Sequence, residues 1–384
     1  MCVGLLFLSS RLPPDLREGS NDLSLYRETG EEILRGEVPY RDFLIEYPPG
    51  SLAAFVPPAF FSASRHGFID AFAMEMAVVL AATLVVTALA ARRVRGSRAW
   101  LLPSATFVAA AFLLYPVALT RYDAVVALAL GLAAFLATLG GRYAVLAYAS
   151  LGVGAAAKLV PALAALPLAL VRRSVALGLA VFVATVALLF VPFVLLGGRG
   201  LWEGFAYQTE RGLQVESLAA SVLIPLRATG VVFEHGAFEV RGGAAGLAAT
   251  LSPLSTIVFL GITGLVMYSR YRRSGGPGVE AFPGHAAALI LAFMLGSKVL
   301  SPQYMLWLLP LVPLAAGGAA GAVVCAIFLA ACLLTTQVYP IHYGDLLSFR
   351  YPGPQLLLAR NLLLVGLWVL LLALPATARE VRPS

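Results

Sequence analysis

Charged residues are scarce in this chain of 384 residues: Asp, Glu, Lys and Arg together make up 12% of the sequence, and hydrophobic residues make up 60%. The mean hydropathy of +0.87 lies well above that of soluble proteins. Several apolar runs are long enough to cross a hydrocarbon core about 30 Å thick. The alternation of apolar and polar residues that marks membrane β-barrels is missing. The sequence therefore predicts an all-α, polytopic integral membrane protein.

Sequence patterns for metal, nucleotide and disulfide sites are also missing. The three cysteines, Cys2, Cys325 and Cys332, lie in apolar surroundings and suggest neither a disulfide framework nor a zinc site. There is no HExxH motif, and no glycine-rich loop suits the phosphates of a soluble nucleotide. We therefore expect no metal and no cofactor. An enzyme of this composition would need a donor substrate that is already in the membrane.

The arginines predict the orientation of the chain, and the net charge of +7 needs no nucleic-acid partner to explain it. Under the predicted spans, one side carries short loops and a tail rich in arginine, which the positive-inside rule assigns to the cytoplasm. Loops 11–67, 197–243 and 339–354 then face outward. These arginines are Arg92, Arg93, Arg95, Arg98, Arg142, Arg172, Arg173, Arg270, Arg272, Arg273, Arg379 and Arg382. We expect one transmembrane domain over residues 1–384, with spans near 68–91, 99–119, 122–140, 143–157, 159–171, 174–196, 244–268, 284–300, 302–316, 318–338 and 355–376.

Acidic residues gather in the first outer loop, where nine of the chain's twenty acids lie between Asp15 and Glu46. From Leu23 onward, apolar residues recur at helical spacing, which predicts an amphipathic helix that ends near Gly36. Asp22 precedes this predicted helix. Its carboxylate is therefore either an N-cap or a group available for chemistry.

A second pair of acids follows the predicted helix. Asp42 and Glu46 are four residues apart, which places them on one side of a helical or an extended segment. Beside Arg41 and Tyr47, the two carboxylates suggest hydroxyl recognition or base catalysis. A solvated acidic face is the alternative interpretation.

Four charged residues lie near the outer ends of predicted spans. Lys158 in AAAKLVP and Lys298 in LGSKVLSPQY, the only lysines, are embedded in apolar sequence. A cation at bilayer depth costs at least about 2.5 kcal/mol, so each lysine either clamps a phosphate or extends toward the interface. Arg121 and Asp123 in LTRYDAVV lie at a helix junction. They form part of a site, or Asp123 is an N-cap with Arg121 as its ion partner.

Three stretches of the chain carry a combination of motifs. They are Asp22-Leu-Ser-Leu-Tyr26-Arg27 with Gly36, Pro39-Tyr40 and Glu46-Tyr47-Pro48-Pro49; Lys158-Leu-Val-Pro161 with Arg172-Arg173; and Ser301-Pro302-Gln303-Tyr304-Met-Leu-Trp307-Leu-Leu-Pro310. In order and spacing, over most of the chain, they resemble GT-C fold glycosyltransferases. The nearest relatives are bacterial polyprenyl-phosphate-mannose-dependent alpha-mannosyltransferases, and the first mannosyltransferase of GPI-anchor synthesis shares a similar plan.

The resemblance implies a GT-C bundle of about 11–12 transmembrane helices. It also implies an inverting transfer of a sugar, mannose in the relatives, from a polyprenyl-phosphate donor to a lipid or glycan hydroxyl outside the bacterial plasma membrane. Asp22 falls at the family's catalytic Asp, the general base. Lys298, Gln303 and Tyr304 fall where relatives contact the donor phosphate, although some relatives carry His where this chain has Gln303-Tyr304.

A transporter or flippase of lipid-linked saccharides is the competing class of protein. It would also place charges in a membrane cavity, but near the midplane between repeated halves with broken helices. No matching halves are evident in this sequence. A catalytically inactive scaffold, in which Asp22 and Lys298 would be replaceable, is the third interpretation.

Overall fold

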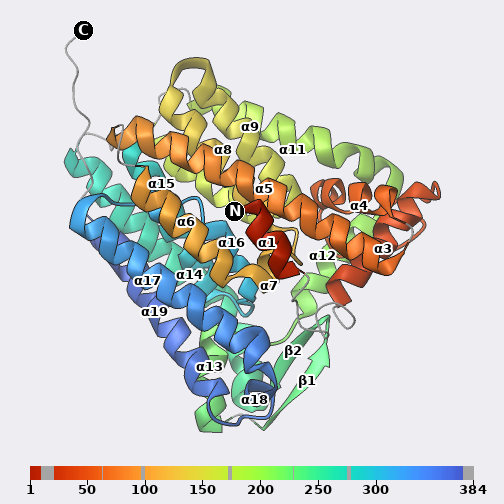
Figure 1. The fold of residues 1–384 in the computed structure, drawn as a ribbon. Coiled ribbons are helices and arrows are strands. Elements are labelled where there is room, and N and C mark those ends of the chain that lie inside the picture. The colour runs from red at the N-terminus through yellow and green to blue at the C-terminus, as the bar shows by residue number, and fades with distance from the viewer. Residues whose placement is uncertain are drawn as a thin grey trace.

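A computed structural model describes residues 1–9, 21–62, 64–96, 100–171, 175–227, 229–274 and 278–374. Five of the arginines that we assign to the cytoplasmic side lie outside these residues: Arg98, Arg172, Arg173, Arg379 and Arg382. The all-α prediction is confirmed, because helices dominate and one hairpin is the only sheet in the described residues (Figure 1). The helices are α1 (Cys2–Ser9), α3 (Asn21–Leu34), α4 (Val56–Phe61), α5 (Arg65–Arg95), α6 (Leu101–Leu113), α7 (Tyr115–Ala118), α8 (Asp123–Leu139), α9 (Gly141–Ala157), α10 (Ala165–Val171), α11 (Val175–Gly197), α12 (Arg199–Glu210), α13 (Leu218–Arg227), α14 (Gly243–Ser274), α15 (Phe282–Gly296), α16 (Met305–Leu308), α17 (Gly318–Thr336), α18 (Tyr343–Leu347) and α19 (Gly353–Ala373). The hairpin consists of β1 (Gly230–Glu234) and β2 (Ala237–Arg241).

Six helical segments of the described chain are long and apolar enough to cross a membrane. They are Arg65–Arg95, Val175–Gly197, Gly243–Arg273, Val279–Gly296, Gly318–Ile341 and Gly353–Ala373. Two predicted spans, 159–171 and 302–316, are not single helices. Prolines divide them into α10, α16 and the short 3-10 turns η2 (Val160–Ala164), η4 (Pro302–Tyr304) and η5 (Val312–Leu314).

The helices pack in two groups (Figure 1). In one group α5 packs on α8, α8 on α9, and α9 on α11; in the other, α6 packs on α17, α17 on α19, and α15 on both α19 and α14. The groups meet where α5 contacts α6 and where η2 contacts both α9 and α15. The helices differ in how much of their surface the protein covers. None of the most apolar 18 residues of α11 is buried, whereas 78% of the residues of Val279–Gly296 are buried. We therefore place α11 against lipid and α15 inside the bundle.

The two helices that lead to a lysine, α9 and α15, both end just before that lysine. α9 ends at Ala157 and Lys158 adopts an extended backbone, whereas α15 ends at Gly296 just before Lys298. A 3-10 turn with proline in its first turn follows each break. Gly50 packs directly on the end of α9, because a Cβ there would lie 2.5 Å from the Ala156 carbonyl carbon. This close approach brings the chain after α3 next to Lys158.

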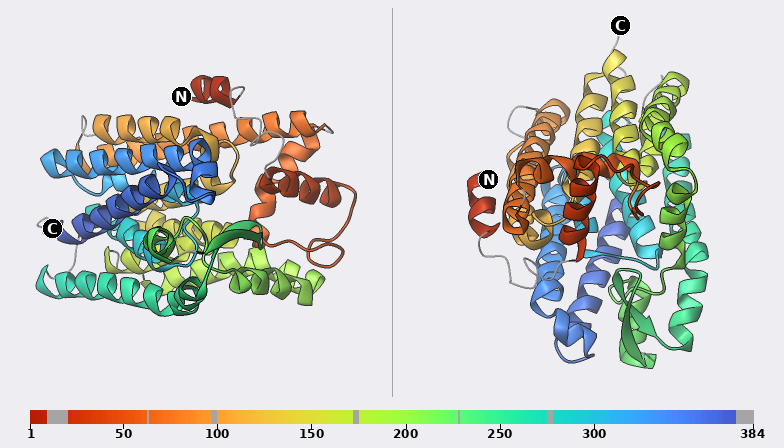
Figure 2. Two further views of the ribbon diagram at one scale, coloured as in Figure 1. Left: turned by 90° about the horizontal axis from the view of Figure 1, so that it is seen from below. Right: turned by 90° about the vertical axis from the view of Figure 1, so that its right-hand side faces the viewer.

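The acidic segment and the arginine-rich ends lie at opposite ends of the bundle. α4 packs on α5, and the C-terminal Arg95 of α5 donates to the carbonyls of Leu314 and Ala316 at the other end of that helix. Arg270, near the end of α14, donates to the Leu372 carbonyl at the end of α19. α3 and the hairpin lie toward the end where α14 and α19 begin (Figure 2). The arginine pattern predicted this separation of charge.

Candidate active site

Asp22 lies in the first turn of α3, where two side chains hold its carboxylate. Arg121 Nη2 lies 2.8 Å from Asp22 Oδ2, and the Tyr47 hydroxyl donates to Oδ1 at 3.0 Å. Arg121 is buried, and it also donates to the Tyr339 hydroxyl at 3.4 Å. The Asp22 side chain keeps 29% of its surface exposed. The carboxylate is therefore fixed in orientation yet open to another molecule.

This placement decides between the interpretations of the two aspartates. α3 begins at Asn21, so Asp22 is a helical residue whose oxygens bind Arg121 and Tyr47, and the N-cap interpretation is wrong. The predicted pairing of Arg121 with Asp123 is also wrong, because Arg121 pairs with Asp22. Tyr122 is the N-cap of α8, and Asp123 is its first residue.

Aromatic rings enclose the back of the Asp22–Arg121 pair. Tyr26, Tyr47, Phe55 and Tyr122 contact one another with ring centroids 4.3 to 5.8 Å apart. Tyr26, Phe55 and Tyr122 are fully buried. Rings packed in this way exclude water, so the charge interactions inside the site are stronger than at a surface.

Lys158 forms a second charged cluster. Its Nζ lies 2.8 Å from Asp123 Oδ1, the oxygen that also accepts a 2.6 Å bond from Trp307 Nε1. The same Nζ lies 5.1 to 5.3 Å from the ring centroids of Tyr122, Trp307 and Tyr304, within cation–π range. Tyr304 stacks on Trp307 with centroids 4.0 Å apart. Because 19% of the lysine side chain stays exposed, the ammonium can also bind an anion.

A cavity of about 570 Å³ joins the two clusters. Its volume falls in the range of about 300–1,000 Å³ typical of small-molecule sites. Seven of the predicted residues line it: Asp22, Glu46, Tyr47, Arg121, Lys158, Gln303 and Tyr304. Asp123 lies behind Lys158, whereas Arg41, Asp42 and Lys298 are not among the lining residues.

Asp42 and Glu46 have separate partners. Glu46 Oε2 lies 3.3 Å from Nη2 of Arg211, just after α12, and burial raises the pKa of the Glu46 carboxyl. Asp42 is bound by Arg41 at 2.8 Å and by the Val38 amide at 2.7 Å, and these contacts lower its pKa to about 2. The prediction that the Asp42 and Glu46 carboxylates lie on one side of the segment is wrong. The turn after Val38 directs the Asp42 carboxylate to the Val38 amide, whereas the Glu46 carboxylate pairs with Arg211.

Lys298 binds protein backbone. Its Nζ donates to the Thr209 carbonyl at 2.7 Å and to the Arg211 carbonyl. Burial lowers the pKa of the Lys298 ammonium. Lys298 therefore fixes the chain that carries Arg211. Arg211 lines the cavity, and Lys298 does not.

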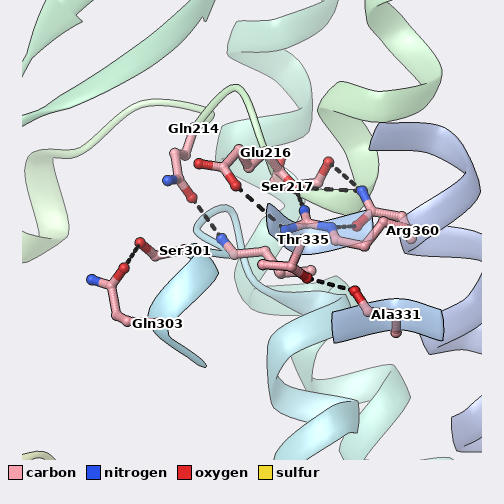
Figure 3. Close-up of polar contacts among 10 residues, drawn as sticks. Gln214, Glu216, Ser217, Ser301, Gln303, Ala331, Thr335 and Arg360 are labelled. Atoms are coloured by element: carbon pink, nitrogen blue, oxygen red, sulfur yellow. Dashed lines mark hydrogen bonds and ion pairs between the residues drawn. The ribbon is translucent and has the colours of Figure 1, made fainter. Parts of the chain in front are cut away.

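Sequence analysis did not identify Glu216, which lines the cavity from the chain between α12 and α13. Its Oε2 lies 3.3 Å from Nη1 of Arg360 in α19, and Arg360 Nη2 donates to the Glu216 carbonyl at 2.6 Å (Figure 3). Both side chains are buried, and burial raises the pKa of the Glu216 carboxyl to about 7 although Arg360 opposes the change. The two residues are 144 positions apart, so no local pattern could have paired them.

The chain before Glu216 is held to the break after α15. The Gln214 side-chain oxygen accepts from the Leu300 amide at 2.8 Å (Figure 3). The backbone amide of Gln214 donates to the Lys298 carbonyl at 3.0 Å. Ser301 donates to the side-chain oxygen of Gln303, which lines the cavity. These bonds join the loop before α13 to the Ser301–Tyr304 stretch, and together the two segments form one wall of the cavity.

The cavity can therefore support proton removal beside an anion. A carboxylate within reach of a hydroxyl can accept its proton, which is general-base catalysis. Fixed cations can stabilise negative charge that develops on a departing phosphate. Asp22 offers the first function, and Lys158 and Arg121 offer the second.

The described helices and this cavity form a membrane fold of the GT-C type. The fold is similar to the crystal structure of ArnT from Cupriavidus metallidurans bound to undecaprenyl phosphate, with a TM-score of 0.53 and 15% sequence identity over 97% of this chain and 75% of that chain. The apo structure of ArnT from the same organism gives a TM-score of 0.51 and 15% identity, over 98% of this chain and 78% of that chain.

The chain belongs to glycosyltransferase family 87, whose model matches residues 43–302. A sequence search of curated proteins finds no match. The matched residues include Glu46, Arg121, Lys158 and Lys298, and Asp22 precedes them.

Proposed function

We propose that this protein transfers a sugar, with inversion, from a polyprenyl-phosphate donor to a hydroxyl of a lipid or glycan. One observation carries the proposal: the Asp22 carboxylate, held by Arg121 and Tyr47, shares a cavity with the Lys158 ammonium. Membership of glycosyltransferase family 87 supports sugar transfer. The similar fold of ArnT, which was crystallised with undecaprenyl phosphate, supports a lipid-linked donor.

In the proposed reaction, Asp22 is the general base. It accepts the proton of the acceptor hydroxyl while the hydroxyl oxygen bonds to the anomeric carbon of the sugar. The bond from that carbon to the phosphate oxygen breaks, and the electron pair leaves with the polyprenyl phosphate. A single displacement of this kind inverts the anomeric carbon, as in glycosidases that use a base to activate the attacking oxygen.

Lys158 and Arg121 bind the donor phosphate in this proposal. Both cations line the cavity, and each has a carboxylate partner that fixes its position. As negative charge builds up on the departing phosphate, these fixed cations lower the barrier without having to reorganise. Glu46, Gln303 and Tyr304 also line the cavity, and we assign them to the hydroxyls of the sugars.

The resemblance of the sequence to polyprenyl-phosphate-mannose-dependent enzymes leads us to propose mannose as the sugar. The arginine-rich ends of the helices lead us to propose that α3 and the cavity face the extracytoplasmic side of a bacterial plasma membrane. The chain would then act as one transmembrane domain whose first outer loop, residues 11–67, contributes the base.

A transfer assay tests this function. Purified protein in detergent is supplied with polyprenyl-phosphate-mannose and a membrane lipid extract, and the release of polyprenyl phosphate and the mannosylated product are followed. The proposal predicts product in proportion to released carrier. Absence of transfer with several donor sugars would contradict it and would favour the transporter class, which a flipping assay in vesicles would then detect.

A further inference from the structure

The tip of the β1–β2 hairpin brings together three side chains that can bind a metal ion. The ligand atoms of Glu234, His235 and Glu239 all lie within 4.8 Å of one another. His235 Nδ1 lies 3.2 Å from Glu239 Oε1. Two ligands bound about 2.0–2.1 Å from one ion at a tetrahedral angle lie about 3.3 Å apart, so this separation already suits a shared ion.

The register of the hairpin explains why these side chains meet. Val232 pairs with Glu239 and Glu234 pairs with Ala237, so the two glutamates lie on the same face of the ribbon. His235 and Gly236 form the two-residue turn with φ angles of 49° and 69°, the turn geometry that matches the twist of a hairpin. This turn places the imidazole beside the two carboxylates.

We propose that Glu234, His235 and Glu239 bind a divalent transition-metal ion such as Zn²⁺. One imidazole nitrogen and two carboxylate oxygens form a ligand set that zinc accepts, with a fourth position left for water. Two carboxylates balance the charge of a divalent ion. The Tyr207 ring packs on the His235 ring with centroids 5.5 Å apart and holds the imidazole in place. Glu234 pairs with Arg241, and the ion would replace this guanidinium as the partner of the carboxylate.

The ion would stabilise one wall of the cavity. Phe233, Gly236, Ala237 and Phe238 of the hairpin line the cavity. The Phe238 carbonyl accepts a 2.9 Å bond from the Val215 amide, on the chain that leads to Glu216. An ion at the hairpin tip would therefore fix the position of the chain that carries Glu216, without contact with the reacting atoms.

Metal binding can be measured on the full-length protein without any transfer assay. Purified protein, free of affinity tag and stripped with a chelator, is titrated with Zn²⁺ and its bound zinc is determined after dialysis. We expect about one tightly bound ion per chain, and an affinity at least about tenfold weaker in His235→Ala and in Glu239→Gln. The control is His342→Ala, because His342 pairs with Asp345 but belongs to no three-ligand group in the described residues.

Cobalt gives a second readout that misfolding does not imitate. Co²⁺ bound by wild type should produce visible absorption bands that zinc abolishes and that His235→Ala lacks, while the melting temperature without metal is the same for both proteins. Zinc binding that is equal in wild type and His235→Ala, or lost equally in His342→Ala, would overturn the proposal. Since binding is read directly, failure here leaves the proposed transferase function untouched, and failure of transfer leaves the metal site untouched.

Discussion

Arg121 and Asp22 form an ion pair of 2.8 Å across the cavity wall, although one residue precedes α8 and the other lies in the first turn of α3. The pair orients the carboxylate, and it places a cation beside the position where we propose that the phosphate departs. The two residues therefore act as one unit in the proposed mechanism.

Arg121→Gln should slow transfer on the order of 10²-fold, because a base that is no longer oriented is misplaced relative to the acceptor. The rates of the single variants and of Asp22→Asn/Arg121→Gln form a double-mutant cycle. Arg121 also contacts the phosphate in the proposed mechanism, so the double variant should be slower than Asp22→Asn alone. If the pair orients the base as a unit, this further loss is smaller than the loss that Arg121→Gln causes in wild type. Effects that multiply would contradict this coupling.

Lys158→Met should weaken the binding of polyprenyl phosphate by about ten- to a hundredfold, the value of one charge-assisted bond of about 1.5–3 kcal/mol. Lys298→Met is the matched control, because Lys298 binds backbone carbonyls and is not among the lining residues. The affinity of Lys298→Met for polyprenyl phosphate should stay near that of wild type. Binding is measured in detergent, and melting temperatures identify any variant that unfolds. An equal loss in both variants would argue against the assignment of Lys158.

Glu46 and Asp42 should contribute differently to transfer, since only Glu46 lines the cavity. Glu46→Gln leaves the largely buried Arg211 without its charged partner and should slow transfer about tenfold. Asp42→Asn changes a residue that is not among the lining residues and should keep the rate within about twofold. The reverse order of rates would show that Asp42, and not Glu46, contacts the substrate.

Glu216 should make stability depend on pH. Burial raises the pKa of its carboxyl to about 7 in the folded protein, above the ordinary value of 4.5. The folded state therefore binds the proton more tightly than the unfolded state. This contribution is fully present below about pH 4.5 and is lost as pH rises through about 7, with a total on the order of 3 kcal/mol.

Glu216→Gln removes this titration. The melting temperature of wild type should fall between pH 5 and pH 7 more steeply than that of Glu216→Gln, because amide and protonated acid are both neutral. The control is Glu203→Gln in α12, which changes an exposed acid that does not line the cavity. Equal slopes for wild type and Glu216→Gln would show that Glu216 stays ionised over this range.

The sequence was sufficient to predict the helical membrane fold, and it singled out seven of the residues that line the cavity. Hydropathy located the long spans, and the motifs around Asp22, Glu46, Lys158 and Tyr304 marked residues that do line the cavity. The fold prediction succeeded because apolar run length and helix-breaking prolines act locally, so both are visible in the sequence.

Long-range pairing was not predictable in the same way. Only the packing of α19 against the chain after α12 reveals Glu216 as the partner of Arg360. Lys298 illustrates the opposite error, because its sequence suggests a phosphate ligand while the fold gives its ammonium two backbone carbonyls. A turn signal was present at His235-Gly236, between two apolar runs, and could have predicted the hairpin.

The rate of sugar transfer by Asp22→Asn tests the central claim most directly. Asn keeps the size of the side chain but cannot act as a base, and Glu28→Gln, an exposed residue of the same helix, is the control. General-base catalysis predicts a loss on the order of 10²-fold or more in Asp22→Asn. The control should keep the wild-type rate, and polyprenyl phosphate should still bind to Asp22→Asn. Transfer by Asp22→Asn at the wild-type rate would contradict the account and remove Asp22 from the mechanism.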